Sequence, residues 1–251
     1  MKITSWNCCL KLGAKAGAIL SLRPDIAIIQ ECEQLPQDHF EGQTFHWVGH
    51  NSRKGLGIIA PEGAAKRDKS FNSCLDYFLP LNFDCGLKVL GVWSFTHRAK
   101  ARFGDGHKGH VSYAINCYYD WLCESDRSMV CGDFNNSVIW NKGDKESNFL
   151  NTKRRLQKLG FESVFHKLTH QAFGEESVAT FYHTKQQQKP YHIDYLFVKG
   201  GNPISHNIGA FEDWIRLSDH MPITADIQFG SLASQFYLYW YRRDFKVPFK
   251  H

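Results

Sequence analysis

The amino-acid sequence predicts a single domain of mixed α/β class. Several short segments alternate apolar and polar residues as half-buried strands do, among them residues 2–7 and 192–198. Other segments place apolar residues at helical spacing, among them residues 111–123 and 153–159, and Gly160 follows the latter in the position of a helix C-cap. No linker, charge block or repeat divides the 251 residues. Since a β-rich sandwich of this length is commonly one domain, we expect one here.

The composition is that of a protein with a large core. Hydrophobic residues make up 43% of the chain and aromatic residues 14%, which excludes a disordered protein. The first residues lack the apolar segment of a signal peptide, and no stretch approaches the ~20 apolar residues of a membrane span. We therefore expect a cytoplasmic protein without a membrane span. Its 8 Cys are scattered, apart from Cys8-Cys9, so free thiols are expected rather than a disulfide framework.

The charge balance is compatible with a polyanionic partner. The formal net charge is +5 with histidine counted as neutral, and the sequence pI is about 8.7. Such an excess suits nucleic acid or anionic lipid headgroups. It is equally compatible with no charged partner, because Lys and Arg are common on solvated surfaces.

The N-terminal residues predict a strand, a helix and a second strand. The first strand ends on Asn7, and apolar residues recur at helical spacing over 11–22 before a proline. Residues 25–29 form a nearly continuous apolar run, which is typical of a strand buried on both faces. This strand places Glu31 where it meets solvent. Glu31 is either a surface or capping residue, or a metal ligand.

The next part of the chain predicts further strands and a basic loop. Residues 45–50 and 55–60 are typical of two strands joined by a polar turn. A third strand, 87–95, leads to His97 and then to a loop over 98–110 that is rich in glycine and cations. This loop is either a solvated surface loop or one that contacts phosphate beside the site. Its cations include Arg98, Lys100, Arg102 and Lys108.

An acid and an amide follow the short apolar strand 129–131. Gly132 is expected to break this strand and to deliver Asp133 and Asn135, while Phe134 turns into the core. Residues at positions i and i+2 of an extended segment point to the same side, so the acid and the amide should emerge together. The alternative is an ordinary strand followed by a turn rich in Asp and Asn, which favour turns for local hydrogen-bonding reasons.

The C-terminal third predicts strands at 180–183, 192–198 and 223–229. Asp194 lies inside the alternating pattern of the second of these strands. Asp219-His220 lies in the loop that enters the last strand.

Five separated stretches therefore place acids, amides or histidine at or near strand ends, where ligand sites of sheet proteins commonly lie. In this order they resemble the motifs of the endonuclease/exonuclease/phosphatase superfamily, which includes metal-dependent phosphoesterases related to deoxyribonuclease I and exonuclease III. The resemblance spans about residues 1–229 and is closest to small bacterial members. It rests on Ser5-Trp6-Asn7, Ile29-Gln30-Glu31, Gly132-Asp133-Phe134-Asn135, Ile193-Asp194-Tyr195 and Ser218-Asp219-His220.

The resemblance implies a four-layer α/β/β/α sandwich, in which two mostly antiparallel sheets pack face to face with helices outside. The site is then expected at one edge of the sandwich. The domain would cover residues 1–230, and residues 231–251 would form a C-terminal tail. The tail interleaves aromatic residues with arginine, which could stack on bases or lie at a membrane interface. We expect instead that it packs on its own domain, because aromatic residues mostly contribute buried area.

Hydrolysis of a phosphodiester needs a water nucleophile in line, charge neutralisation on the phosphate and help for the departing oxygen. Carboxylate and amide oxygens are hard ligands that suit Mg²⁺ or Mn²⁺. We expect the following roles. The metal is held by Glu31, Asn7 and Asp219, and Asp133 orients or deprotonates the attacking water. The phosphate is bound by Asn135 and Asn7, and Asp194 pairs with His220. The leaving group is assisted by His97, and the substrate is contacted by Arg98 and Lys108.

One position departs from the family pattern. Many DNA-repair members carry a second acid two residues after the first asparagine, and Cys9 occupies that position here. The predicted function is a divalent-metal-dependent phosphodiesterase, a nuclease acting as endonuclease or exonuclease on DNA or RNA as a monomer. The alternatives are a phosphatase or phospholipid phosphodiesterase with the same site, and a non-catalytic binding protein. The last is disfavoured because every residue that the mechanism needs is present.

Overall fold

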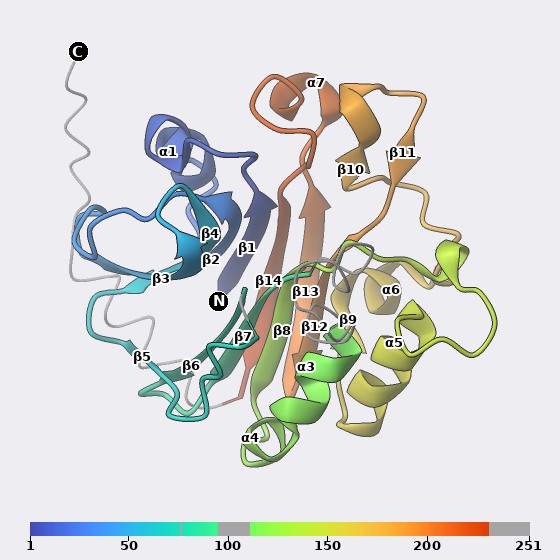
Figure 1. The fold of residues 1–251 in the computed structure, drawn as a ribbon, viewed down its shortest axis with the longest axis horizontal. Helices are drawn as coiled ribbons and strands as arrows, with labels where there is room; N and C mark the ends of the chain where they lie inside the picture. The colour runs from blue at the N-terminus through green and yellow to red at the C-terminus, as the bar shows by residue number, and fades with distance from the viewer. Residues whose placement is uncertain (76, 95–110, 231–251) are drawn as a thin grey trace.

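Two six-stranded sheets form the centre of the computed structural model, which describes residues 1–75, 77–94 and 111–230 (Figure 1). In the first sheet the strand order is β13-β14-β1-β2-β4-β3, and in the second it is β5-β6-β7-β8-β12-β9. The strands of the first sheet are β13 (Gly201–Ile208), β14 (Ile223–Phe229), β1 (Lys2–Asn7), β2 (Ile26–Cys32), β4 (Lys54–Pro61) and β3 (Gln43–Asn51). The strands of the second are β5 (Ala65–Arg67), β6 (Phe78–Phe83), β7 (Lys88–Trp93), β8 (Ser128–Asp133), β12 (Asp194–Lys199) and β9 (Glu162–Ser163).

Each sheet contains one parallel pair of strands, and its other pairs are antiparallel. The parallel pairs are β1 with β2 and β7 with β8. A parallel pair needs a crossover between its strands, which usually contains a helix. The helix α1 (Leu12–Leu20) connects β1 to β2, and the helices α3 (Val111–Cys117) and α4 (Tyr119–Cys123) lie between β7 and β8. The strands β1 and β8 contact each other across the sandwich, and their carboxyl ends lie close together, since the last residue of β1, Asn7, donates a hydrogen bond to the last residue of β8, Asp133.

Three clusters of buried side chains fill the spaces between four successive layers of helices and sheets. The inner faces of both sheets supply one core, with residues such as Ile28 from β2 and Cys131 from β8. The outer face of the first sheet packs against α1 and α7 (Phe211–Trp214). The outer face of the second packs against α3, α4 and α5 (Phe149–Lys158). Figure 1 shows α1 and α3 on opposite outer sides. The α/β/β/α sandwich implied by the sequence motifs is therefore confirmed.

Smaller elements complete the described chain. The strands β10 (Phe181–Tyr182) and β11 (Pro190–Tyr191) form a short hairpin of their own. The helix α6 (Val164–Thr169) contacts β13, an edge strand of the first sheet, and β12, which lies next to the edge strand β9 of the second. The short 3₁₀ turns are η1 (Val138–Trp140) and η2 (His183–Lys185).

Two predictions about the strands that carry the central acids are wrong. Gly132 does not end β8, which continues to Asp133. A Cβ atom at this position would lie only 1.9 Å from the backbone oxygen of Val92, so the glycine is needed because β7 passes so close. Asp194 is the first residue of β12 and not an interior one, because the strand begins where it pairs with β8.

Other predicted elements differ at their boundaries. Residues 111–123 form two helices instead of one, because the backbone of Tyr118 leaves the helical conformation between them. The helix predicted over 153–159 begins earlier, at Phe149, and Gly160 follows it with a positive φ of 86°, as a helix-ending glycine does. The strand β13 was not predicted, because its many polar residues and Pro203 hide the alternation on this edge strand.

All eight cysteines are free thiols, as expected. In the part of the chain that the structure describes, no helix is long and apolar enough to cross a membrane. His97, Arg98, Lys108 and the tail 231–251 lie outside the described residues.

Candidate active site

The ends of four strands bring the central polar residues to one edge of the sandwich. Asn7 is the last residue of β1, and Asp133 is the last residue of β8. The register of β8 with β12 places Asp194 directly opposite Asp133. The loop before β14 supplies His220, whose backbone forms a bridge with Phe181. These residues are far apart in the sequence and meet because the two sheets stack with their strand ends together.

Asp133 is fully buried and accepts hydrogen bonds from two asparagines. The side-chain nitrogen of Asn7 donates to its Oδ2 over 3.0 Å. Asn135 donates its backbone N–H to Oδ1 over 2.8 Å and its side-chain nitrogen to Oδ2 over 2.9 Å. The side chain of Asn135 also donates to the backbone oxygen of Ser94 over 2.8 Å. Asp133 and Asn135 therefore emerge together as predicted, although for a different reason.

The reason is the backbone conformation of Asn135. Its φ of 47° lies in the left-handed region, so the i, i+2 rule for an extended strand does not apply. This conformation turns the backbone N–H and the side chain of Asn135 back onto the same carboxylate. Asparagine is one of the few residues other than glycine that adopt this conformation readily.

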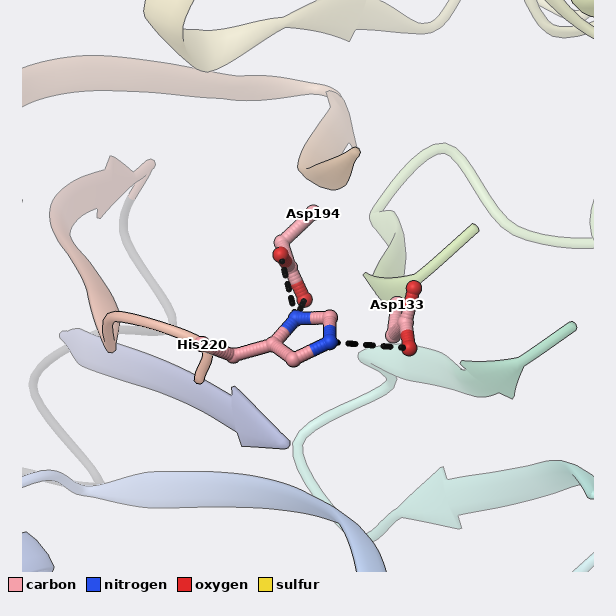
Figure 2. A group of neighbouring side chains, drawn as sticks. All are labelled: Asp133, Asp194 and His220. Carbon is pink, nitrogen blue, oxygen red and sulfur yellow. Dashed lines mark hydrogen bonds and ion pairs between the residues drawn. The ribbon is translucent and has the colours of Figure 1, made fainter. Parts of the chain in front are cut away.

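His220 lies between the two buried carboxylates (Figure 2). Its Nδ1 lies 3.0 and 3.2 Å from the two oxygens of Asp194, and its Nε2 lies 3.9 Å from Oδ2 of Asp133. The backbone of His220 is fixed as well, because its N–H donates to Ser218 Oγ and its oxygen accepts from Trp6 Nε1, both over 3.0 Å. The orientation of the imidazole is therefore determined at the ring and at the backbone.

The two carboxylates control the protonation of His220. Burial acts to lower the pKa of this imidazole, but Asp194 and Asp133 outweigh it and raise the pKa from 6.5 to about 10. Burial raises the pKa of Asp133 to about 7, and the charge of Asp194 adds to this, while His220 and the asparagine hydrogen bonds oppose it. At neutral pH the site therefore holds an imidazolium between two acids.

Two polar side chains, which no sequence motif had assigned a role, hold these segments in place. Lys15 Nζ donates to the backbone oxygens of Cys8 and Leu217, over 2.6 Å in each case. Thr180 Oγ1 accepts from the backbone N–H of Asp194 over 3.1 Å. No spacing rule could have found them, because each joins segments that are distant in the sequence. Ser218 lies inside a quoted motif, and its hydroxyl donates to the backbone oxygen of Asn7 over 2.6 Å.

Glu31 lies beside this buried group and is bound to a cation of the protein. Its Oε2 lies 2.9 Å from Lys54 Nζ, and both side chains are partly exposed. The register of β2 with β4 shifts between Gln30 and Cys32, and Glu31 has a φ of 56°. A bulge of this kind redirects a side chain. Lys54 Nζ also lies 5.1 Å from the centre of the Trp93 ring.

The charges of Glu31 and Asp219 act on the Cys9 thiol, and Asn7 accepts a hydrogen bond from the Cys9 backbone. Burial raises the pKa of the Cys9 thiol, and the negative charges of Asp219 and Glu31 raise it further. The backbone N–H of Cys9 donates to Oδ1 of Asn7 over 3.1 Å.

Two sets of side chains could hold a metal ion. Ligand atoms of Asp133, Asp194 and His220 lie within 4.8 Å of one another. This buried set can take a cation only when His220 loses its proton, because an imidazolium has no free electron pair for a metal. The set of Asn7, Glu31 and Asp219 offers only hard oxygen ligands, which fit Mg²⁺ or Mn²⁺.

The structure therefore brings Asn7, Asp133, Asn135, Asp194 and His220 into one cluster, with Glu31 and Asp219 beside it. No family model and no curated protein matches the chain.

Solved structures match the chain along most of its length. A 3′-5′ exonuclease from Neisseria meningitidis superposes with a TM-score of 0.70 at 16% identity, over 91% of this chain and 100% of that one. An AP endonuclease from Archaeoglobus fulgidus has a TM-score of 0.64 at 18% identity, over 91% and 99%. An endonuclease/exonuclease/phosphatase family protein from Leptotrichia buccalis has a TM-score of 0.61 at 15% identity, over 91% and 100%. This chain thus has the fold of the endonuclease/exonuclease/phosphatase proteins.

Proposed function

We propose that this protein hydrolyses phosphodiester bonds of nucleic acids with the help of Mg²⁺ or Mn²⁺. The observation that carries the proposal is the buried pair of Asp194 and His220, with Nε2 of the imidazole facing Asp133. A protonated histidine beside a carboxylate suits the attack of water on a phosphate, because the carboxylate can accept the proton of the water and the imidazolium can stabilise the negative charge of the phosphate. The solved structures with this fold include proteins described as an exonuclease and as AP endonucleases.

Asp133 is assigned to the attacking water. A general base works best when its pKa lies near the operating pH, and burial raises the pKa of Asp133 to about 7. The hydrogen bonds from Asn7 and Asn135 hold the carboxylate in one orientation. Asp133 can then orient the water and accept its proton.

His220 is assigned to the phosphate. Asp194 holds Nδ1, so the Nε2–H of the imidazolium is the group that can donate to a phosphate oxygen. The pKa of about 10 keeps this proton in place at neutral pH. Asn7 and Asn135 are also assigned to the phosphate; Asn135 would have to release Asp133 or Ser94 first, because its side-chain nitrogen donates to both. His97 is assigned to the departing oxygen, and Arg98 and Lys108 to the substrate backbone, on the sequence pattern alone.

Glu31, Asn7 and Asp219 would hold the divalent cation. When bound, it would neutralise charge on the non-bridging oxygens of the phosphate. Glu31 has to release Lys54 to bind the cation, because their charged groups lie 2.9 Å apart. Lys54 would then be free to face the anionic substrate.

A second candidate activity is removal of a terminal phosphate from DNA. It uses the same site, and one structure with this fold is described as a 3′ phosphatase bound to a product DNA hairpin. The net charge of +5 suits either nucleic acid substrate.

The test offers substrates side by side to the purified protein with Mg²⁺ or Mn²⁺. They are a single-stranded oligonucleotide, a duplex, RNA, a 3′-phosphorylated oligonucleotide, a lipid phosphodiester and a soluble phosphomonoester. We expect metal-dependent release from nucleic acid that His220→Ala abolishes. Absence of turnover of every substrate, in a folded sample loaded with metal, would contradict the proposal and favour a binding protein. Turnover of the lipid phosphodiester alone would show that the protein is a phospholipid phosphodiesterase.

A further inference from the structure

A row of aromatic rings leads from His220 to the surface. The Phe181 ring lies 4.5 Å from the imidazole, measured between ring centres. Phe181 stacks on Tyr191 at 6.3 Å, and Tyr191 lies 5.1 Å from Trp140. The rings come from β10, β11 and η1, which are three separate segments. The row therefore ends on the turn that directly follows the strand of Asp133.

The outer end of this row is exposed although it is apolar. Trp140 is 41% exposed, and the neighbouring Ile139 is 53% exposed. The turn that carries them is well fixed, because Trp140 N–H donates to Ser137 O over 3.2 Å and Asn141 N–H donates to Val138 O over 3.1 Å. A fixed turn that presents an indole and an aliphatic side chain to water beside an active site is typical of a contact surface. Neither side chain is part of the buried core.

Cations lie on the same hairpin as two of these rings. Lys185 and Lys189 are exposed in the turn between β10 and β11. Lys185 Nζ donates to the backbone oxygen of Arg216 over 3.5 Å, in the segment that leads to Asp219-His220. Thr184 and Lys185 both have left-handed φ values, of 54° and 58°, which turn the hairpin tip sharply. Aromatic rings next to cations are the combination that binds single-stranded nucleic acid.

We propose that Trp140, supported by Tyr191, forms a stacking surface for an unpaired nucleobase next to the phosphate held at His220. The substrate is then single-stranded nucleic acid, or the unpaired end of a duplex. In a duplex the faces of the bases are covered by their neighbours, so a surface indole can stack only on a base that is free. This inference rests on the proposed function, because it takes the phosphate to lie at His220.

The test compares the affinities of variants for matched oligonucleotides in EDTA, where no turnover occurs. The first probe is a single strand with all its bases, and the second has the same length and charge but base-free nucleotides at its centre. The variants are Trp140→Ala and Trp140→Phe, and the control is Tyr119→Ala. Tyr119 is an aromatic residue that is 51% exposed, and it lies on α4, which packs against the outer face of the second sheet.

Stacking of one base on an aromatic ring corresponds to about 5- to 150-fold in affinity. We expect Trp140→Ala to weaken binding of the complete strand by a factor in this range and to leave the base-free strand nearly unchanged. Trp140→Phe keeps a ring and should fall in between, while Tyr119→Ala should match the wild type. We also expect the wild type to bind a single strand more tightly than a blunt duplex.

Equal losses for both strands, or no loss for either, would overturn the stacking surface. So would a wild-type protein that prefers the blunt duplex. Failure of the proposed function looks different. In that case Trp140→Ala would still weaken binding of the complete strand more than binding of the base-free strand, but the wild type would hydrolyse no nucleic acid with any metal. Conversely, hydrolysis with unchanged affinity in Trp140→Ala would contradict only the stacking surface.

Discussion

Asp133 and Asp194 lie directly opposite each other on neighbouring antiparallel strands, and the imidazole of His220 lies between their carboxylates. Two buried carboxylates this close would repel each other strongly. The imidazolium supplies the compensating charge, two asparagine side chains donate to Oδ2 of Asp133, and the backbone N–H of Asn135 donates to Oδ1. The charge states of Asp133 and His220 thus depend on each other and on the charge of Asp194.

This mutual dependence predicts non-additive losses of activity. His220→Ala and Asp194→Asn should each reduce kcat by about 10²- to 10⁴-fold, because each removes support for charge or proton transfer in the transition state. The double variant should be little worse than either single variant, since the two residues act as a unit. Single-turnover rates on a labelled oligonucleotide would measure this. Asp213→Asn, an exposed acid on α7, is the matched control. Losses that simply multiply would show that Asp194 has only a structural role.

The raised pKa of His220 predicts a loss of stability at alkaline pH. Its folded-state pKa of about 10 lies above its ordinary value of 6.5, so its stabilising contribution is complete below 6.5 and is lost as the pH rises through about 10. The pKa of Asp133 is raised to about 7, so the contribution of Asp133 to the free energy of unfolding changes with pH below 7 and not above it. Between pH 7 and 10 the Tm of the wild type should therefore fall more steeply than the Tm of His220→Asn.

Thermal unfolding in EDTA would measure this difference without a contribution from bound metal. His39→Asn, at an exposed histidine, is the control and should follow the wild type. Parallel Tm curves for the wild type and His220→Asn would show that the imidazolium does not gain stability from the two acids.

The ion pair of Glu31 and Lys54 predicts opposite effects on metal binding. Glu31→Gln should weaken the binding of Mn²⁺ and remove most of the activity, because it removes a charged ligand. Lys54→Met should strengthen the binding, because the cation that now lies 2.9 Å from the carboxylate is gone. Calorimetric titration with Mn²⁺ would measure both, with circular dichroism to check the fold. Unchanged affinity in Glu31→Gln would move the metal to another set, the buried Asp133, Asp194 and His220 being the first candidate.

The basic segment between β7 and α3 predicts a salt-dependent affinity. Each phosphate contact made by a lysine or arginine contributes a slope of about −0.7 to −0.9 to the logarithm of affinity against the logarithm of salt concentration. Neutralising the four cations of this segment, Arg98, Lys100, Arg102 and Lys108, should flatten the slope accordingly. Fluorescence anisotropy from 50 to about 200 mM salt would measure it. Affinity that does not depend on salt in the wild type would favour a small-molecule substrate.

The sequence by itself determined which strands carry the candidate site residues at or near their ends. Alternation and apolar runs identified β1, β2, β8 and β14, because these central strands are buried and their side chains follow the period of a strand. The order of Asn7, Glu31, Asp133, Asp194 and Asp219-His220 also pointed to the fold that the structure shows. Local pattern and motif order are properties of the chain, so both can be read without coordinates.

Only the tertiary structure decided which of these residues touch. The pairing of Glu31 with Lys54 depends on a bulge in β2, and the contact of Asp194 with His220 joins two segments through space. The contact of Trp140 with Tyr191 likewise depends on the packing of separate segments. Such contacts form because two sheets bury a common core and bring their strand ends to one edge. Burial also sets the charge states of Asp133 and His220, since a pKa responds to surroundings that the chain creates only when it is folded.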